Sequence, residues 1–342
     1  MATLLSRAWR REDLPDLSLT EAELDEVTPL LYGSGGAALA WKRVAKTHLR
    51  NTASAELLHQ AYRLHSLQAA MHEQRIAKVF RLFREARVDA ILAKGWVAAG
   101  MYVETALRPY GDIDLCVRPE HRKAAREVLS TPEANDCWVD LHNHFLELDE
   151  RAVDEIFGRA RLAHLGGEPI RTLGPEDHLA LLCIHLLKHG AWRPIWLCDI
   201  GAAVETLAEG FNWKICLGRD RTRASWIASA VGLAGRLLHA DTVKLPIQAE
   251  VRLPAWLIEN VLNQWAHPFA IDQPPNTHPV PMAQLLRHPA GLPEGLRKRW
   301  PNAIIATISV HGRLNSLPRL PYQVANCVAR MGHLLVHQSA DD

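Results

Sequence analysis

Two aspartates stand two positions apart in a short apolar run, Asp112–Val117. Side chains alternate between the faces of an extended strand, so Asp112 and Asp114 point the same way while Ile113 points into a core. Two adjacent carboxylates repel each other unless a cation lies between them, and hard oxygen ligands suit Mg²⁺ that is shared with substrate phosphates. The spacing therefore predicts a metal site that handles phosphate groups.

A third acid follows in a second β-like run, Cys137–Phe145. Asp140 and His142 share one face of this strand, while Val139 and Leu141 share the other. A neighbouring strand can bring Asp140 against the first pair, and three carboxylates on adjacent strands favour a two-metal site for in-line phosphoryl chemistry. His142 is a candidate base for the acceptor hydroxyl, although a histidine on a strand is more often a packed residue.

A lysine-glycine turn precedes these acids, where a short strand ends at Ala93 and a helix begins after Lys94-Gly95. Backbone amides and the positive end of a helix favour phosphate at such a turn. Lys94 and Arg108 add positive charge for the β and γ phosphates and for the leaving pyrophosphate. Gly111 belongs to this nucleotide site or is a simple turn residue. The structural alternatives are a solvated surface lysine and a loop-capping arginine.

Four polar residues in a later helical stretch are candidates for the opposite wall of a cleft. They are His185, Lys188, His189 and Asp199. The two histidines lie one helical turn apart, but no third ligand follows at metal spacing, so packing or cleft-lining is the simpler interpretation. A buried structural pair explains Lys188 and Asp199 nearly as well as a role in the cleft.

The surrounding pattern predicts an α+β protein with three parts. Residues 1–87 are expected to be a helical lead-in, because apolar residues recur at helical intervals from Leu57 to Phe83. Residues 88–149 are expected to form a small mixed-sheet core with strands at 89–93, 112–117 and 137–145 and helices at 96–103 and 119–129. Residues 150–342 are expected to return to helix and to form a C-terminal helical domain, with a start signal at Gly174-Pro175.

Two further segments stand out. Segment 267–301 holds eight of the twenty prolines, so we expect an extended crossing segment or lid with short helical pieces, before a last helix at 321–338. The sequence Y-G-S-G-G at 32–36 imitates a glycine-serine phosphate turn, but no D-x-D follows within reach and helical sequence surrounds it. We interpret it as a helix break.

The composition excludes several classes of protein. With 48% hydrophobic and 23% charged residues, the chain is globular. Its 39 basic residues nearly balance 38 acidic ones, so no global field concentrates nucleic acid or anionic membrane. The six cysteines form no C-x-x-C pair, which indicates neither zinc nor a disulfide framework. No run has the length of a signal peptide or a bilayer span, so we expect a cytoplasmic protein that binds no membrane.

In this order, the motifs K-G, R-x-x-G-D-I-D-L, V-D-L-H, a helical H-x-x-K-H and a distal W-x-x-D-I resemble the bacterial family called uncharacterised nucleotidyltransferases, within the DNA polymerase β-type superfamily. The resemblance runs from about residue 30 to about residue 204. It implies metal-binding acids at Asp112, Asp114 and Asp140 and a phosphate turn at Lys94-Gly95. Most superfamily members have Gly-Ser or Gly-Gly at this turn, so the choice of nucleotide is not implied.

The resemblance also implies a reaction. A nucleoside monophosphate would pass from an NTP to an acceptor with release of pyrophosphate, and Mg²⁺ or Mn²⁺ would be the cofactor. A small molecule, a peptide, a protein or an RNA end could be the acceptor, and the missing basic patch argues mildly against RNA. The alternatives are a catalytically silent, nucleotide-binding regulatory module and the nucleotidyltransferase half of a toxin–antitoxin pair.

Overall fold

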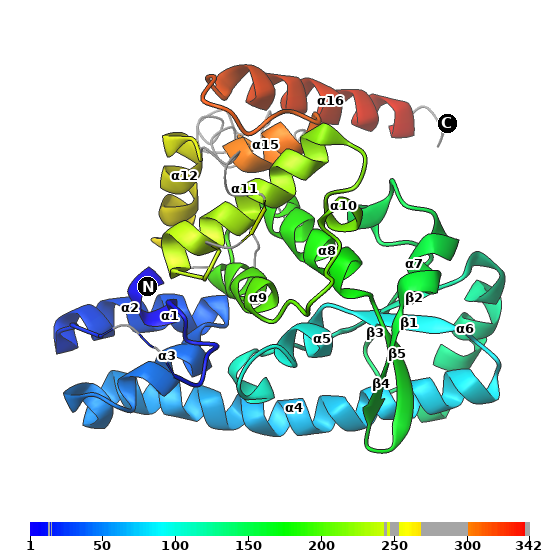
Figure 1. Ribbon diagram of the computed structural model, residues 1–342, viewed down its shortest axis with the longest axis horizontal. Helices are drawn as coiled ribbons and strands as arrows, with labels where there is room; N and C mark the ends of the chain where they lie inside the picture. Colours follow the sequence, from blue (N-terminus) through cyan, green and yellow to red (C-terminus); the bar gives the residue numbers. More distant parts are fainter. Residues whose placement is uncertain (13, 15, 243–244, 247–252, 268–299, 339–342) are drawn as a thin grey trace.

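The computed structural model describes residues 1–12, 14, 16–242, 245–246, 253–267 and 300–338. Its N-terminal helices are α1 (Ala2–Leu5), α2 (Glu21–Ser34), α3 (Ala37–Val44) and α4 (Ala53–Glu85). The central part consists of β1 (Ala90–Ala93), α5 (Gly95–Ala99), β2 (Ile113–Val117), α6 (Arg122–Leu129), β3 (Val139–His142), α7 (Val153–Arg159), β4 (Arg161–Leu165) and β5 (Glu168–Thr172). The later helices are α8 (Pro175–Lys188), α9 (Pro194–Glu205), α10 (Trp213–Leu217), α11 (Arg221–Leu238), α12 (Ala255–Trp265), α15 (Ala303–Ser309) and α16 (Leu320–Gln338) (Figure 1).

The break between α2 and α3 lies where the glycine-rich sequence predicts it. Thr20 caps the start of α2 and forms a capping box with Glu23. The helix ends at Ser34 because Gly35 adopts a left-handed conformation with φ 80°, which glycine reaches without steric cost. After α3, helix α4 runs for 33 residues along one side of the molecule (Figure 1). The predicted helix break and helical lead-in are confirmed.

The five strands form one mixed sheet in the order β3-β2-β1-β5-β4. β1 pairs antiparallel with β2, with Leu92 opposite Leu115, and pairs parallel with β5. β2 pairs parallel with β3, while β4 and β5 form an antiparallel hairpin. The predicted fold class, an α+β protein with a small mixed sheet between helical segments, is confirmed.

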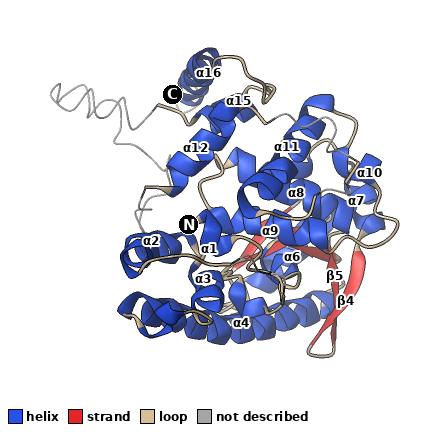
Figure 2. Cartoon of the chain, turned by 60° about the vertical axis from the view of Figure 1, so that its left-hand side comes forward, coloured by secondary structure: helices blue, strands red, loops and turns tan. Residues whose placement is uncertain are grey.

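The two faces of the sheet bury different side chains, as the alternation along a strand requires. Ile113 and Leu115 pack with apolar side chains of α4 on one face. Ile91 and Cys116 belong to the core that the sheet shares with the later helices on the other face. Asp114 alternates with Ile113 and Leu115, so its carboxylate faces the later helices. Figure 2 shows the sheet between α4 and these helices.

Two expectations about the core are wrong. The chain returns to helix after residue 150 only in the short α7, and the β4–β5 hairpin that follows joins the sheet beside β1. Gly166 and Gly167 both have positive φ, 56° and 83°, which suits a two-residue hairpin turn. The helix expected at 96–103 is shorter, since α5 ends at Ala99. The sheet therefore extends to Thr172, beyond the core boundary that the sequence predicts.

The later helices form a wall that faces the sheet. α8 and α9 are mostly buried, and α11 packs against both of them. All six cysteines are free thiols, in agreement with their spacing. Among the described residues, no helix combines the length and the apolar character that a bilayer span needs. Most of the proline-rich segment 267–301 lies outside the described residues, and the division into three domains stays a prediction.

Candidate active site

The two acidic strands pair as the sequence predicts. β2 and β3 run parallel, with Asp114 opposite Asp140 and Cys116 opposite His142. The ligand atoms of Asp114, Asp140 and His142 all lie within 4.8 Å of one another. His142 Nε2 is 3.1 Å from Asp140 Oδ2 and 3.5 Å from Asp114 Oδ1. This register places Asp140 beside Asp114 instead of in the core, so the predicted pairing is confirmed.

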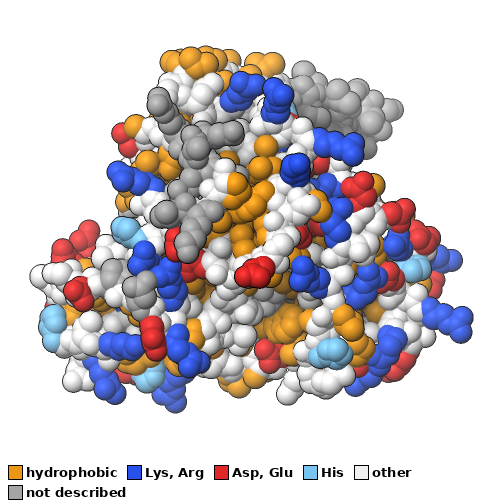
Figure 3. Space-filling view, viewed as in Figure 1, with side chains coloured by type: hydrophobic (Ala, Val, Ile, Leu, Met, Phe, Trp, Pro, Cys, Tyr) orange, Lys and Arg blue, Asp and Glu red, His pale blue; other side chains and the backbone are white. Residues whose placement is uncertain are grey.

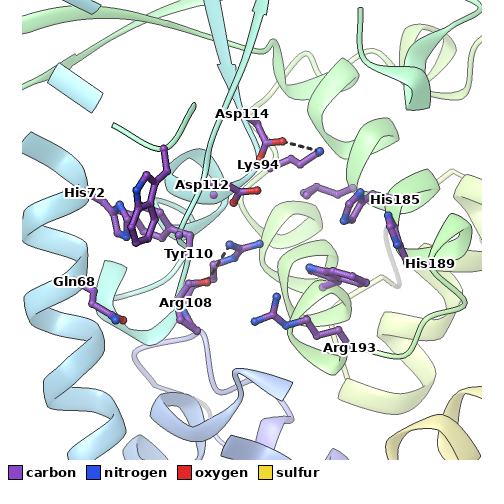
Figure 4. A pocket seen from close by; sticks show the side chains of 16 residues that line it. Gln68, His72, Lys94, Arg108, Tyr110, Asp112, Asp114, His185, His189 and Arg193 are labelled. Carbon is purple, nitrogen blue, oxygen red and sulfur yellow. Dashed lines mark hydrogen bonds and ion pairs between the residues drawn. The ribbon is translucent and has the colours of Figure 1, made fainter. Parts of the chain in front are cut away.

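Asp112 precedes β2 and is exposed, whereas Asp114 is buried. Both carboxylates face one cavity, as Figure 4 shows. The sequence predicts a cluster of Asp112, Asp114 and Asp140, but the compact group in the described residues contains His142 in place of Asp112. Asp112 therefore lies at the edge of the acidic cluster, which we define as Asp112, Asp114, Asp140 and His142.

Lys94 joins the predicted phosphate turn to this acidic cluster. Its Nζ donates a hydrogen bond of 2.9 Å to Asp114 Oδ1, and both side chains are largely buried. Burial alone would raise the pKa of Asp114, but the interactions with His142 and Lys94 outweigh burial and lower it. Burial would likewise lower the pKa of Lys94, but the carboxylates of Asp114 and Glu147 raise it. Lys94 and Asp114 are therefore a charged pair at neutral pH.

The backbone of the Lys94 turn is unusual for a residue with a side chain. Lys94 has φ 50° and ψ −131°, a region that glycine adopts far more readily. Its N–H donates to Nε2 of His178, on α8, at 3.2 Å. Burial lowers the pKa of His178 to about 4, so the imidazole is neutral at pH 7 and can accept this bond. A helix of the opposite wall thus holds the turn in place.

A cavity of about 400 Å³ lies between the acidic cluster and the later helices. Eight of the residues predicted from the sequence line it: Lys94, Gly95, Arg108, Gly111, Asp112, Asp114, His185 and His189. The lining also contains residues without a predicted site role: Gln68, His72, Pro109, Tyr110, Trp138, Leu182, Arg193 and Trp196. The cavity therefore has one wall from the sheet and α4 and another from α8 and α9.

The helical wall carries a carboxylate–imidazole pair. His185 Nδ1 lies 3.0 Å from Glu147 Oε1, and Glu147 is 9% exposed. Burial would raise the pKa of Glu147, but His185 and Lys94 lower it to about 2. The rings of His185 and His189 are 4.5 Å apart, and burial lowers the pKa of His189 to about 4. The described residues offer these two histidines no third metal ligand, and they line the cavity as expected.

Arg108 and Asp199 form a buried pair behind the cavity. Arg108 Nη2 donates to Asp199 Oδ2 at 2.7 Å, and Asp199 has no exposed surface. The hydroxyl of Tyr102 donates to Asp199 Oδ1, also at 2.7 Å. Of the two alternatives for Asp199 and Lys188, neither residue lines the cavity. Asp199 belongs to a buried structural pair, but its partner is Arg108, and Lys188 Nζ donates to the carbonyl of Leu146 instead. The guanidinium that the sequence assigns to phosphate is therefore neutralised by Asp199.

The acidic cluster fits a divalent metal ion. Asp114 and Asp140 offer hard carboxylate oxygens, which suit Mg²⁺ and Mn²⁺. His142 Nε2 is buried and lies next to both carboxylates, 3.1 Å from Asp140 Oδ2 and 3.5 Å from Asp114 Oδ1, so in a neutral imidazole this nitrogen can serve as a third ligand. Asp112 adds a carboxylate at the mouth of the cluster. The four side chains together could hold one or two ions.

Several residues of the site have no local signature in the sequence. Gln68 and His72 are four positions apart in α4, and Arg193 precedes the first residue of α9. Their place in the cavity depends on how these helices pack against the core. Glu147 follows the second acidic strand closely, and only the later His185 identifies it as more than a surface acid. Tertiary packing, not spacing, assembles this part of the site.

Among known protein families, the uncharacterised nucleotidyltransferases match residues 20–240 of the chain. No curated protein and no solved structure shows significant similarity to it. The matched region runs from α2 through α11, so it contains the Lys94 turn, the acidic cluster and both walls of the cavity. On this match, the chain belongs to the family of uncharacterised nucleotidyltransferases.

Proposed function

We propose that the cavity catalyses transfer of a nucleoside monophosphate from an NTP to an acceptor, with release of pyrophosphate. The parallel register of β2 and β3 carries this proposal, because it sets Asp140 beside Asp114, which lines the cavity together with Lys94. Substrate phosphates add negative charge to such a cluster, so a cation is needed. Mg²⁺ or Mn²⁺ held by Asp112, Asp114, Asp140 and His142 would neutralise the phosphates and polarise the reacting phosphoryl group.

The Lys94-Gly95 turn is the proposed binding site of the triphosphate. The Lys94 ammonium has three donors and uses one for Asp114, which leaves two for phosphate oxygens. Gly111 lines the cavity, and a Cβ at this position would meet no atom within 4 Å, so there is room for a ligand. Arg108 also lines the cavity, but its pairing with Asp199 makes it chiefly a residue that holds the wall.

The transfer step needs a base for the acceptor. The acceptor oxygen forms a bond to the α-phosphorus, the bond from this phosphorus to the pyrophosphate oxygen breaks, and the hydroxyl proton passes to the protein. Asp140 is the proposed base, because its side chain is 57% exposed while it remains 3.1 Å from His142 Nε2. His142 would be neutral when it binds the metal, so the proton of the acceptor goes to the Asp140 carboxylate.

The acceptor is proposed to be a small molecule, a peptide or a protein. In Figure 3, positive and negative side chains are interspersed on the visible face of the described residues. The net charge of the whole chain is +1. Proteins that bind RNA normally present a concentrated basic surface, so this charge distribution favours the other acceptor classes. The cytoplasm remains the predicted compartment, and free cysteines are the normal state there.

Incubation with each α-labelled NTP and a cell extract tests the proposed transfer. We expect label on an acceptor together with pyrophosphate release, both lost on metal chelation and restored by Mg²⁺. The labelled product would identify the nucleotide and the acceptor class in one experiment. Binding of an NTP without pyrophosphate release in any extract would contradict the transfer and indicate a regulatory nucleotide-binding module.

A further inference from the structure

Arg193 brings a guanidinium to the lining of the cavity. It is the N-cap residue of α9, and Figure 4 shows its side chain beside Arg108 in the lining. Its Nε donates to the carbonyl of Ser34 at 3.1 Å. In the part of the chain that the structure describes, no carboxylate lies within ion-pair distance of Arg193, whereas the buried Arg108, Arg151 and Arg223 each have one. Among the described residues, no carboxylate therefore neutralises the charge that Arg193 brings to the cavity lining.

The helix break at Ser34–Gly36 orients this guanidinium. Gly35 has φ 80°, and a Cβ there would lie 3.1 Å from Arg193 Nη2 and 3.3 Å from Pro109 Cγ. A side chain at position 35 would be strained by its backbone and would press against the guanidinium. The break thus supplies both the carbonyl that holds Arg193 and the space that it fills. This gives the glycine-rich sequence of the N-terminal helices a role in the site.

The surroundings of Arg193 favour an anion. Burial and the positive charge of Arg108 lower the pKa of Arg193, and the nearby Asp112 and Asp199 offset this only in part. Helix α9 has no side-chain cap and no acidic residue in its first turn, so its positive end is also uncompensated. Burial and the charge of Arg193 together lower the pKa of His65 to about 4. The neighbouring charge of Arg108 and the uncapped end of α9 thus leave this end of the cavity short of negative charge.

We propose that Arg193 is the centre of an anion subsite, on the far side of Arg108 from Asp114, that binds a phosphate or carboxylate group. A guanidinium suits such groups because its planar donors match their oxygens in pairs. The neighbouring ring of Trp196, 5.8 Å from the guanidinium carbon, supports its orientation. This subsite rests on the proposed function. The anion would be either the terminal phosphate of the NTP or an acidic group of the acceptor.

Calorimetry on the full chain, with Mg²⁺, tests the subsite. The variant is Arg193→Gln, which removes the charge and keeps a polar side chain. The probes are non-hydrolysable forms of the four NTPs, the matching monophosphates, and inorganic phosphate added to the protein saturated with the analogue that binds best. If the anion is the terminal phosphate, the variant binds the triphosphate about 10- to 100-fold more weakly, as for one charge-assisted contact, and the monophosphate unchanged.

If the anion belongs to the acceptor, nucleotide affinities stay unchanged, but the saturated variant loses the binding of inorganic phosphate that the original protein shows. Unchanged triphosphate affinity together with unchanged phosphate binding would overturn the subsite. Arg193→Lys should restore part of the affinity because it returns the charge. Arg81→Gln, at an exposed position of α4, is the matched control and should alter neither ligand.

A second variant keeps the test independent of Arg193 itself. Gly35→Ala leaves the guanidinium in the chain but crowds it, so the same probe should bind several-fold more weakly while circular dichroism remains that of the folded protein. These measurements need no turnover. A failure of nucleotidyl transfer would therefore leave the anion subsite intact, and a failure of the subsite would leave the transfer activity to be judged on its own.

Discussion

The acidic cluster and the Arg108–Asp199 pair both place carboxylates next to cations, yet they differ in how the charges are balanced. Asp199 is completely buried, and Arg108 and Tyr102 satisfy its two oxygens. The acidic cluster contains three carboxylates beside Lys94 and His142; Asp112 and Asp114 line the cavity, and the side chain of Asp140 is 57% exposed. Burial of an acid therefore does not mark a functional site in this protein. The proposed site rests instead on an excess of negative charge beside open space.

The largest expected effect comes from the acidic cluster. Asp112→Asn should reduce transfer by about 1,000-fold or more, since the loss of a metal ligand removes several kcal/mol of transition-state stabilisation. The fold should remain, because Asp112 is exposed. Asp114→Asn should abolish transfer too, but it also breaks the ion pair with Lys94 and should lower the melting temperature. Rates of pyrophosphate release and thermal unfolding measure both effects, and near-normal turnover of Asp112→Asn would remove it from the metal site.

The Arg108–Asp199 pair should show the opposite behaviour. Arg108→Ala leaves Asp199 buried without its counter-charge, so the free energy of unfolding should fall by about 3–5 kcal/mol. Replacement of both partners, Arg108→Met with Asp199→Leu, should recover much of this loss because no charge stays buried. Urea denaturation distinguishes the variants. If the Arg108→Ala protein were as stable as the original protein but bound NTP more weakly, Arg108 would be a phosphate ligand and not a structural partner of Asp199.

A substitution of Asp140, the proposed base, separates the rate of transfer from the binding of NTP. Asp140→Asn should reduce transfer by about 100-fold or more, as expected for loss of a general base, and should leave NTP binding nearly unchanged. Lys94 and the other three members of the cluster still hold the nucleotide. Single-turnover rates and calorimetry separate these two effects. Glu133→Gln, an exposed acid on the preceding segment, is the matched control. Equal loss of binding and of rate would show that Asp140 holds the nucleotide instead.

The smallest expected effect concerns His178, which links the two walls. Its folded pKa is about 4 against 6.5 for the free side chain, so below pH 6.5 the unfolded chain binds a proton that the folded protein does not. Stability should therefore fall as the pH drops from 6.5 towards 4. His65 and His189 have pKa values of about 4 as well and should act in the same direction. The charged groups that act on His178 are Lys94, Arg108, Asp114 and Asp199.

His178→Gln keeps an acceptor for the Lys94 N–H but removes one titrating group. Near pH 5, the slope of the unfolding free energy against pH should decrease by up to about 1.4 kcal/mol per pH unit, the value for one proton. Urea denaturation between about pH 5 and pH 7.5 provides this slope. An unchanged slope would mean that His178 is protonated in the folded protein and does not accept the Lys94 bond.

Strand alternation made the acidic strands predictable. Asp114 and Asp140 had to avoid the core that Ile113 and Leu141 enter, and one register satisfies both strands. The β4–β5 hairpin was also readable, because Gly166-Gly167 is a strong two-residue turn signal. The helix start signal at Gly174-Pro175 and the helical pattern after it predict only helix for this part of the chain, so the hairpin was not predicted.

The partners across the cavity could not be predicted in the same way. The sequence allows Asp199 to be a cleft residue or half of a buried pair with Lys188, but its partners are Arg108 and Tyr102, which lie 91 and 97 residues earlier in the chain. The role of Arg193 likewise depends on Ser34, 159 residues away. No local pattern encodes such distances. The periodicity of the sequence predicts which face of a helix or strand a side chain lies on. Which residues contact that face depends on how the helices and the sheet pack together.

The order of the strands has a consequence for biosynthesis. β1, β2 and β3 come from one continuous stretch, so the acidic cluster can form as soon as this stretch has left the ribosome. The groups that hold the Lys94 turn and Arg108 emerge much later, since His178 and Asp199 follow them by 84 and 91 residues. In a nascent chain, the acidic cluster is therefore synthesised before the helices α8 and α9 that form the opposite wall of the cavity. Phosphate-binding competence should be acquired late during translation, when α8 and α9 dock onto the sheet.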